Sequence, residues 1–462
     1  MTALFAEHAL LPSGWATDVR LAWDADGILT EVTPGAGREH AERVTGPVLP
    51  GMPNLHSHAF QRAMAGLTEY RTAGENSFWS WRRLMYAFAQ RITPEQLEAI
   101  AAQVYIEMLR AGYTSVCEFH YIHHDPHGRP YADRVEMCER LIAAAGNSGI
   151  GLTLLPVLYE NSGFGGRPAL PEQRRFLSSP ETLLEMLSEL RRRHPEHAGL
   201  RYGAAPHSLR AVAPQSLQRL EAGLAAANGR APIHIHIAEQ TAEVEDSRAA
   251  LGTSPVTWLL DHARVDARWC LVHAIHMTPE ETARVARTAA TIGLCPTTEA
   301  NLGDGVFDAA GYLSAAGSWG IGSDSHASVS VQEELRWLEY AQRLIHRQRA
   351  VLTDARTPSV ASHLYRHAVA GGALASARNI AGLAVGQRAD LVVLDPDAAD
   401  AMNDADASLS AWIFAHHGAH GAPDVMAAGR WAVKDGYHVV QDAVLREYVR
   451  ARDTLLAAID RP

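Results

Sequence analysis

The sequence is short of cysteine, of positive charge and of long apolar runs, and each shortage argues against a class of protein. Cys117, Cys138, Cys270 and Cys295 form no Cys-x-x-Cys pair, so we expect buried reduced thiols rather than disulfides or a thiolate zinc site. With 41 basic and 52 acidic residues, the net charge of −11 argues against a nucleic-acid partner.

No apolar stretch approaches the ~20 residues of a membrane-spanning helix, so we expect no membrane partner. The first residues, Met1 to Glu7, lack the basic flank and long apolar run of an export signal. We therefore expect a cytoplasmic protein.

The 462 residues exceed the usual length of one domain, and 47% of them are hydrophobic, which is typical of a globular protein with a large core. Short apolar runs alternate with Gly, Pro and Asp near both ends of the chain, in a pattern typical of small antiparallel strands. These runs cover residues 18–23, 27–32, 44–49, 382–395 and 425–436. We predict that residues 1–50 and 376–462 together form a small β-sandwich domain.

Between these ends, eight strand-like runs alternate with amphipathic helical stretches such as residues 94–110 and 214–228. The runs end near His56, Phe119, Leu158, Pro206, Ile237, His273, Pro296 and Ser323. Eight alternations predict an α/β protein with a (β/α)8 barrel over residues 51–375. An open doubly wound sheet is the alternative, but polar residues follow most of the runs, as at the active-site face of a barrel.

Among 24 histidines, His56 and His58 stand out because they end the first run of the middle region, two residues apart. Side chains two apart on a strand point the same way, so these two imidazoles can share one metal ion. His236 is similarly placed at the open end of the fifth run, whereas His234 lies in a layer below it. Asp324 ends the eighth run and adds an anionic ligand.

We therefore predict one zinc ion, or a similar divalent metal, held by His56, His58, His236 and Asp324 with an open position for water. Glu239 follows His236 closely enough to carry a proton to or from that water, although it could simply begin a helix. His273, at the end of the sixth run, is placed to hydrogen-bond the water. Asp324 and His273 would thus act with Glu239 in catalysis.

This pattern resembles the amidohydrolase superfamily over nearly the whole chain. It includes Leu-Pro-Gly at 49–51, the ligand set above, and Gly-Gln-Arg-Ala-Asp-Leu-Val-Val-Leu at 386–394. Many members bridge two metals with a lysine on the fourth strand, but residues 200–207 contain no lysine. The resemblance therefore implies the branch with a single metal ion, which includes deaminases.

Four longer motifs closely resemble the formimidoylglutamate deiminase family of bacterial histidine degradation. They lie at residues 53–66, 77–83, 206–210 and 295–303. The resemblance implies hydrolysis of N-formimidoyl-L-glutamate to N-formyl-L-glutamate and ammonia by a homodimer. It also implies a set of substrate contacts, namely Gln61, Arg82, Tyr121, His207 and Arg210.

Two arginines suit this small-molecule substrate, because it carries two carboxylates and a guanidinium grips a carboxylate with paired hydrogen bonds. We expect Arg82 in the long loop after the first strand, where the adjacent Arg83 could take its role. The histidine-rich tract at 120–127 is expected to form a polar loop. A ring aminohydrolase of the guanine or cytosine type and a non-catalytic scaffold remain alternatives.

Overall fold

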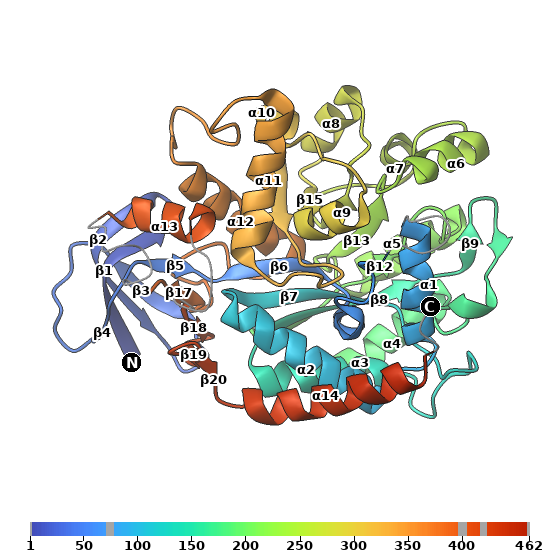
Figure 1. Cartoon of the computed structure of the whole chain (residues 1–462), viewed down its shortest axis with the longest axis horizontal. Coiled ribbons are helices and arrows are strands. Elements are labelled where there is room, and N and C mark those ends of the chain that lie inside the picture. Colours follow the sequence, from blue (N-terminus) through green and yellow to red (C-terminus); the bar gives the residue numbers. More distant parts are fainter. Residues whose placement is uncertain (1, 71–77, 396–403, 416–422, 460–462) are drawn as a thin grey trace.

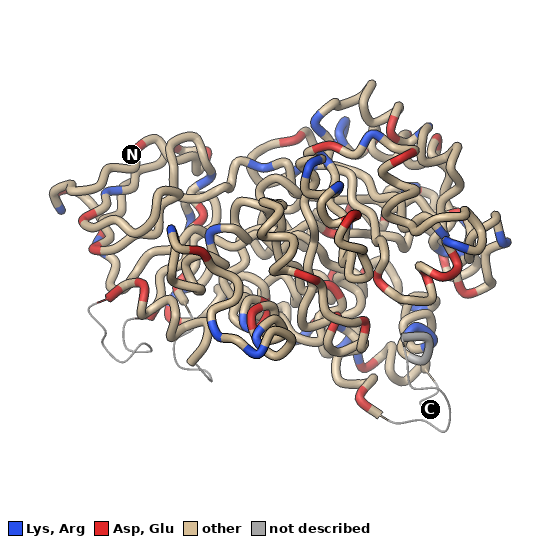
Figure 2. Tube along the Cα trace, turned by 90° about the horizontal axis from the view of Figure 1, so that it is seen from above, with Lys and Arg blue, Asp and Glu red and all other residues tan. Residues whose placement is uncertain are grey.

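The computed structural model describes residues 2–70, 78–395, 404–415 and 423–459, without the side chains of residues 78–80. Figure 1 shows a small sheet beside a larger α/β body. Acidic and basic residues are interspersed over both parts (Figure 2). None of the helices in the described ranges is long and apolar enough to cross a membrane.

Both ends of the chain contribute to the small sheet, which joins nine strands. β5 pairs antiparallel with β17, so that Pro50 faces Leu391 and the two distant segments meet in the middle of the sheet. Leu4, Leu21 and Met426 share one hydrophobic core there. The strands are β1 Thr2–Leu11, β2 Gly14–Trp23, β3 Leu29–Thr33, β4 Glu42–Val44, β5 Val48–Pro50, β17 Leu391–Val393, β18 Asp424–Ala427, β19 Arg430–Lys434 and β20 Tyr437–His438. The prediction that both ends of the chain join in one small β unit is confirmed, and the described strands of this unit form a single sheet rather than two. The limits of the unit at residues 50 and 376 stay a prediction.

The larger body is a TIM-type barrel, as predicted, and its strands end within a few residues of the predicted positions. They are β6 Met52–Ser57, β7 Tyr113–His120, β8 Gly151–Leu158, β11 Leu200–Tyr202 with β12 Ala205–Pro206, β13 Ile233–Ile237, β14 Trp269–His273, β15 Thr291–Leu294 and β16 Ser318–Ile321. All pairings among them are parallel and fall into two groups, β11/β12-β8-β7-β6 and β13-β14-β15-β16.

Single bridges join the two groups at both seams. Ala204 pairs with Ile233 at one seam, and Ser57 pairs with Asp324 at the other. At the second seam the Asp324 amide donates to the His56 carbonyl at 3.0 Å, and the His58 amide donates to the Asp324 carbonyl at 3.2 Å. The first and last strands of the barrel therefore meet at the predicted metal ligands.

Helices surround the barrel, and a side-chain cap marks the start of several of them. α2 begins after Thr93, whose hydroxyl accepts from the Gln96 amide while the Gln96 side chain accepts from the Thr93 amide. The helices are α1 Phe78–Ala89, α2 Pro94–Arg110, α3 Glu136–Ser148, α4 Pro180–Arg193, α5 Pro214–Ala227, α6 Thr241–Leu251, α7 Pro255–His262, α8 Pro279–Ala286, α9 Pro296–Leu302, α10 Ala309–Ser314, α11 Val331–His346, α12 Val360–Ser376, α13 Ala405–Phe414 and α14 Gln441–Ala457. Short 3-10 helices, η1 Ala59–Met64 and η2 Pro171–Gln173, and the hairpin of β9 Asn161–Gly163 and β10 Arg167–Pro168 lie in the loops.

The prediction of a loop from the first barrel strand to residue 94 was wrong, because α1 lies within it. Met85, Tyr86, Phe88 and Ala89 are buried, so burial of an apolar face stabilises this helix.

The C-terminal helix α14 lies along α2 (Figure 1). Arg452 on α14 donates to the Ala63 carbonyl in η1 at 3.1 Å, so the end of the chain supports the loop that follows the first barrel strand.

Candidate active site

Four side chains from three strands meet around His56, in two overlapping groups: that residue forms one with His58 and Asp324, and the other with His236 and His273. His56 ends β6 with Ser57, His58 follows directly, His236 lies on β13, and Asp324 follows β16. The Nε2 atoms of His56 and His58 each lie 3.4 Å from Oδ1 of Asp324. Nε2 of His236 lies 3.0 Å from Nε2 of His56. All four side chains are buried, so the structure brings together the residues predicted as ligands.

Hydrogen bonds on the far side of two rings leave their Nε2 atoms free to bind a metal. Nδ1 of His58 lies 2.8 Å from the Phe119 carbonyl, and Nδ1 of His236 lies 3.1 Å from the His207 carbonyl. A ring nitrogen that faces a carbonyl carries the hydrogen, so the lone pair of each ring is on Nε2. Burial lowers the pKa of His56 to about 3, which keeps that ring neutral. Neutral imidazoles and a carboxylate around one point fit a divalent cation such as zinc.

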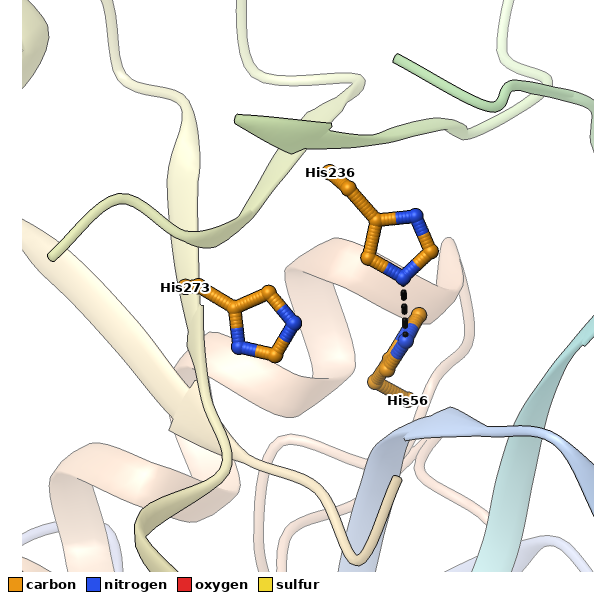
Figure 3. A group of neighbouring side chains, drawn as sticks. All are labelled: His56, His236 and His273. Carbon is orange, nitrogen blue, oxygen red and sulfur yellow. Dashed lines mark hydrogen bonds between the residues drawn. The ribbon is translucent and has the colours of Figure 1, made fainter. Parts of the chain in front are cut away.

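His273 and Glu239 lie beside this cluster. Figure 3 shows the rings of His56, His236 and His273 approaching one another from three separate strands. Nε2 of His273 lies 3.7 Å from Oε1 of Glu239 and 3.9 Å from Oδ2 of Asp324. Burial raises the pKa of Glu239 above its usual value. Burial would lower the pKa of His273, but the charge of Glu239 and the hydrogen bond that the ring donates to Glu299 raise it to about 10.

Glu299 on α9 was not predicted, although it lies inside the motif at 295–303. Its Oε1 lies 3.2 Å from Nδ1 of His273 and also accepts from the Cys295 amide at 2.9 Å. A carboxylate in the first turn of a short helix is usually solvated, so the sequence alone gave no reason to single it out. The structure buries it on the far side of the His273 ring.

Several residues at these strand ends have a strained backbone. Ala238, His273, Ala274, Asp324 and His326 all have positive φ angles, between 43° and 69°. Such a conformation costs a residue with a Cβ atom roughly 1–3 kcal/mol. It persists where the surrounding structure enforces it. Here the strain turns side chains at the ends of β13, β14 and β16 toward the cluster.

A buried polar network behind the cluster was also missed. Glu118 accepts from the Ser57 hydroxyl at 2.6 Å, and that hydroxyl lies 3.1 Å from Nε2 of His326. Nδ1 of His326 lies 3.0 Å from the Ser323 hydroxyl, which accepts from Asn54 at 2.6 Å. The network joins β6 and β7 to the segment after β16 and so fixes the seam that carries the ligands.

The five predicted substrate contacts line one pocket with Glu239, His273 and Asp324. Gln61 donates through Nε2 to the Tyr121 hydroxyl at 2.9 Å. Within the part of the chain that is described, the buried Oε1 of Gln61 and Nε of Arg210 have no hydrogen-bond partner. These two atoms are therefore suited to meet polar atoms of a ligand.

Arg82 and Arg83 are adjacent in the sequence, but their side chains occupy different positions in the structure. Arg82, on α1, lines the pocket that contains Glu239 and His273, which we call the inner pocket. Its guanidinium lies 5.0 Å from the ring centre of Tyr86. Arg83 is exposed and lines only an outer cavity, which also includes Arg167. Arg82 is thus the better placed of the two to contact a substrate near the metal ligands.

Aromatic and apolar side chains that were not predicted complete the pocket wall. They are Trp81, Met85, Tyr86, Tyr159, Phe176 and Leu302. Gln173 fixes two of them, because its amide donates to the Tyr86 hydroxyl at 3.0 Å and to the Tyr159 hydroxyl at 2.8 Å. These residues come from loops, from α1 and from the end of α9, so their meeting could not be inferred from strand periodicity.

The tract at 120–127 differs from the predicted polar loop. His120, Tyr121 and His123 are buried, and Nε2 of His123 lies 2.8 Å from the Val157 carbonyl. His124 makes a similar contact, with Nε2 2.8 Å from the Leu177 carbonyl. Backbone acceptors therefore allow this polar stretch to pack inside the protein. All four cysteines, which lie in the described ranges, are buried free thiols as predicted.

Comparisons with known proteins show the family to which the chain belongs. Residues 48–424 match the Amidohydrolase family, and residues 1–46 match the family described as Formimidoylglutamate deiminase HutF, N-terminal domain. Formimidoylglutamate deiminase from Pseudomonas aeruginosa is 54% identical over 457 residues, covering 99% of this chain and 100% of that protein.

Solved structures give the same result. An amidohydrolase from Brucella melitensis superposes with a TM-score of 0.93 at 46% identity, covering 99% of this chain and 100% of that chain. An adenosine deaminase from Xanthomonas campestris with bound zinc shares the fold, with a TM-score of 0.81 at 21% identity and coverage of 99% and 98%. The chain therefore belongs to the amidohydrolase family and, within it, to the formimidoylglutamate deiminases.

Proposed function

We propose that this chain hydrolyses N-formimidoyl-L-glutamate to N-formyl-L-glutamate and ammonia with one zinc ion held by His56, His58, His236 and Asp324. The observation that carries this proposal is that Arg82 and Arg210 line the same pocket as Glu239 and His273. A substrate with a reactive C=N group and two carboxylates matches a pocket with acid-base groups and two guanidinium groups.

The donor set supports the metal in this proposal. Two neutral imidazoles that meet at 3.0 Å through their Nε2 atoms, with a carboxylate 3.4 Å from one of them, are a natural set of zinc ligands. When bound, zinc lowers the pKa of a water molecule toward neutrality. The solved adenosine deaminase with the same fold contains zinc, which is consistent with this choice.

Glu239 moves the protons in the proposed reaction. The oxygen of water forms a bond to the formimino carbon while Glu239 takes a proton from the water and gives it to the imino nitrogen. The second proton of the water passes from the new hydroxyl group through Asp324 and Glu239 to the same nitrogen, while His273 and Asp324 stabilise the tetrahedral intermediate. The C–N bond to the former imino nitrogen then breaks, ammonia leaves, and the carbon keeps the oxygen as a formyl group.

Arg82 and Arg210 would bind the two carboxylates and fix the formimino carbon near Glu239. The buried carbonyl of Gln61 is suited to accept from an N–H of the amidine, since its amide group already donates to Tyr121. Tyr121 and His207 form the adjoining wall. This arrangement accounts for all the residues implied by the family resemblance.

Ammonia release tests the proposal directly. The zinc-loaded protein should release ammonia from formimidoylglutamate far faster than from guanine or cytosine. Those rings are the right comparison, because the aromatic pocket wall could also stack a planar ring. Faster release from either ring would overturn the proposal, and full activity of the metal-free protein would overturn the role of zinc.

We also propose that the protein is a cytoplasmic homodimer with a small-molecule substrate as its partner. The resemblance to dimeric relatives supports the homodimer, and the metabolic substrate supports the location. Light scattering of the purified protein tests the first statement, since a mass of one 50.1 kDa chain would contradict it.

A further inference from the structure

We propose that Glu299 is a positioning residue that fixes the ring of His273, so that Nε2 of His273 faces Glu239 and the reacting carbon. The proposal rests on the proposed function, because it assigns the reacting carbon to the pocket beside Glu239. Nothing in the family resemblance gave Glu299 a role.

The contacts of the His273 ring carry this proposal. Nδ1 lies 3.2 Å from Oε1 of Glu299, and both side chains are almost completely buried. Nε2, on the other side of the ring, lies 3.7 Å from Glu239 and 3.9 Å from Asp324. Because an imidazole can turn by half a rotation at little torsional cost, the partner of Nδ1 decides which nitrogen faces the pocket. Among the described residues, Glu299 is the hydrogen-bond partner of Nδ1.

Glu299 is itself held in place. Its Oε1 accepts from the Cys295 amide at 2.9 Å, and its carbonyl accepts from the Asp304 amide at 2.9 Å. Asp304 is tied to the loop beside Glu239, because its side chain accepts from Gln240. Helix α9 is therefore fixed at both ends, and the carboxylate of Glu299 cannot move away from His273 without breaking its bond to the Cys295 amide.

Helix α9 is also fixed from the outside of the barrel. The Thr297 amide donates to the buried carboxylate of Glu334 on α11 at 2.9 Å, and the Thr297 hydroxyl donates to the other oxygen of that carboxylate at 2.5 Å. A side chain with this much support is suited to hold a neighbouring ring at one orientation.

A second explanation is that His273, Cys295 and Glu299 bind a further metal ion, since one ligand atom of each lies within 4.8 Å of the others. Burial raises the pKa of the Cys295 thiol well above its usual value, so the thiolate that a metal needs is disfavoured. Metal content is therefore measured in the test below.

The test is a double-mutant cycle with Glu299→Ala and His273→Ala in the zinc-loaded enzyme. Glu299→Ala should lower kcat by about 10–100-fold, with KM within about twofold and unchanged metal content. In the His273→Ala background, Glu299→Ala should cost less than about twofold, because the group it positions is gone. An equal loss in both backgrounds, or a loss of metal, would overturn the proposal.

Conservative variants separate positioning from folding. Glu299→Gln keeps an oxygen for both N–H donors and should restore kcat to within about fivefold of the wild type, whereas a loss as large as that of Glu299→Ala would contradict positioning. Should Glu299→Ala fail to fold, Glu299→Met replaces it. Glu281→Ala is the matched control, because Glu281 is a buried carboxylate that caps the Thr278 amide at 2.8 Å, away from the pocket. It should leave kcat unchanged.

A crystal structure of zinc-loaded Glu299→Ala supplies a readout that does not depend on turnover. The His273 ring should be turned or split between two orientations, with Nε2 no longer fixed toward Glu239; an unchanged ring would overturn the proposal. The cycle uses whichever of the three comparison substrates releases ammonia. Failure of the formimidoylglutamate assignment is thus distinguishable from failure of the role given to Glu299.

Discussion

His234 and His236 lie two residues apart on β13, yet only His236 reaches the ligand cluster. Nε2 of His236 lies 3.0 Å from Nε2 of His56, whereas Nε2 of His234 lies 2.8 Å from the Ala375 carbonyl. Both rings are buried. The pair therefore offers a proposed metal ligand and a matched buried histidine on the same strand.

His236→Ala should remove the metal and reduce activity to background, because three remaining ligands hold the ion poorly. His56→Ala should do the same. His234→Ala should keep one metal ion per chain and lose only stability, by roughly 1–3 kcal/mol for the unpaired carbonyl and the cavity. Elemental analysis after gel filtration measures this, and full metal content in His236→Ala would disprove the ligand assignment.

Glu239→Gln should keep the metal and lose most of the rate. The amide preserves the shape of the side chain but cannot carry a proton, and such groups contribute about 10²–10⁴-fold to rate. Steady-state kinetics together with metal analysis provide the check. Near-normal kcat at normal metal content would show that another group, such as His273, carries the proton.

Arg82→Ala and Arg210→Ala should each weaken binding of the substrate, by roughly 2–5 kcal/mol where the lost carboxylate contact is desolvated. Arg83→Ala is the control on the same helix and should change kcat/KM little, because Arg83 is exposed outside the inner pocket. The sharper test replaces the side-chain carboxylate of the substrate with an amide.

The kcat/KM of the wild-type enzyme should be much lower for the amide analogue than for the substrate itself. For one of the two arginine variants, kcat/KM should be nearly the same for both compounds. If both variants discriminate as strongly as wild type, neither arginine binds that carboxylate. A ring aminohydrolase would then become the stronger candidate.

Buried His123 should make the fold sensitive to acid. Burial lowers its pKa from 6.5 to about 4, so between these values the unfolded chain binds a proton that the folded chain does not. Stability therefore falls as pH falls through this window, and His123 alone should account for about 2 kcal/mol between pH 7 and pH 5. Urea unfolding at both pH values should show a smaller loss for His123→Gln than for wild type. An equal loss in the two proteins would contradict the role of His123.

The eight barrel strands could be predicted because each is a buried apolar run, and because polar residues follow such runs at the active-site face. That His56 and His58 would point to the same side could be predicted from the two-residue period of a strand. Arg82 and Arg83 could not be separated, since neighbours on a helix point about 100° apart and the orientation of α1 depends on packing. Glu118 and Glu299 were missed because a carboxylate gives no sign in the sequence that it will be buried beside a particular hydroxyl or imidazole.

The seam at Ser57 and Asp324 would connect binding of the proposed metal ion to closure of the barrel. Hydrogen-bond partners at this seam, such as Asn54 and Ser323, are 269 residues apart along the chain, so the ligand set cannot exist until the ring of strands has closed. A metal ion bound by residues on both sides of this seam would therefore stabilise the closed barrel. The amides of His58 and Asp324 should then exchange hydrogen far more slowly with metal than without it.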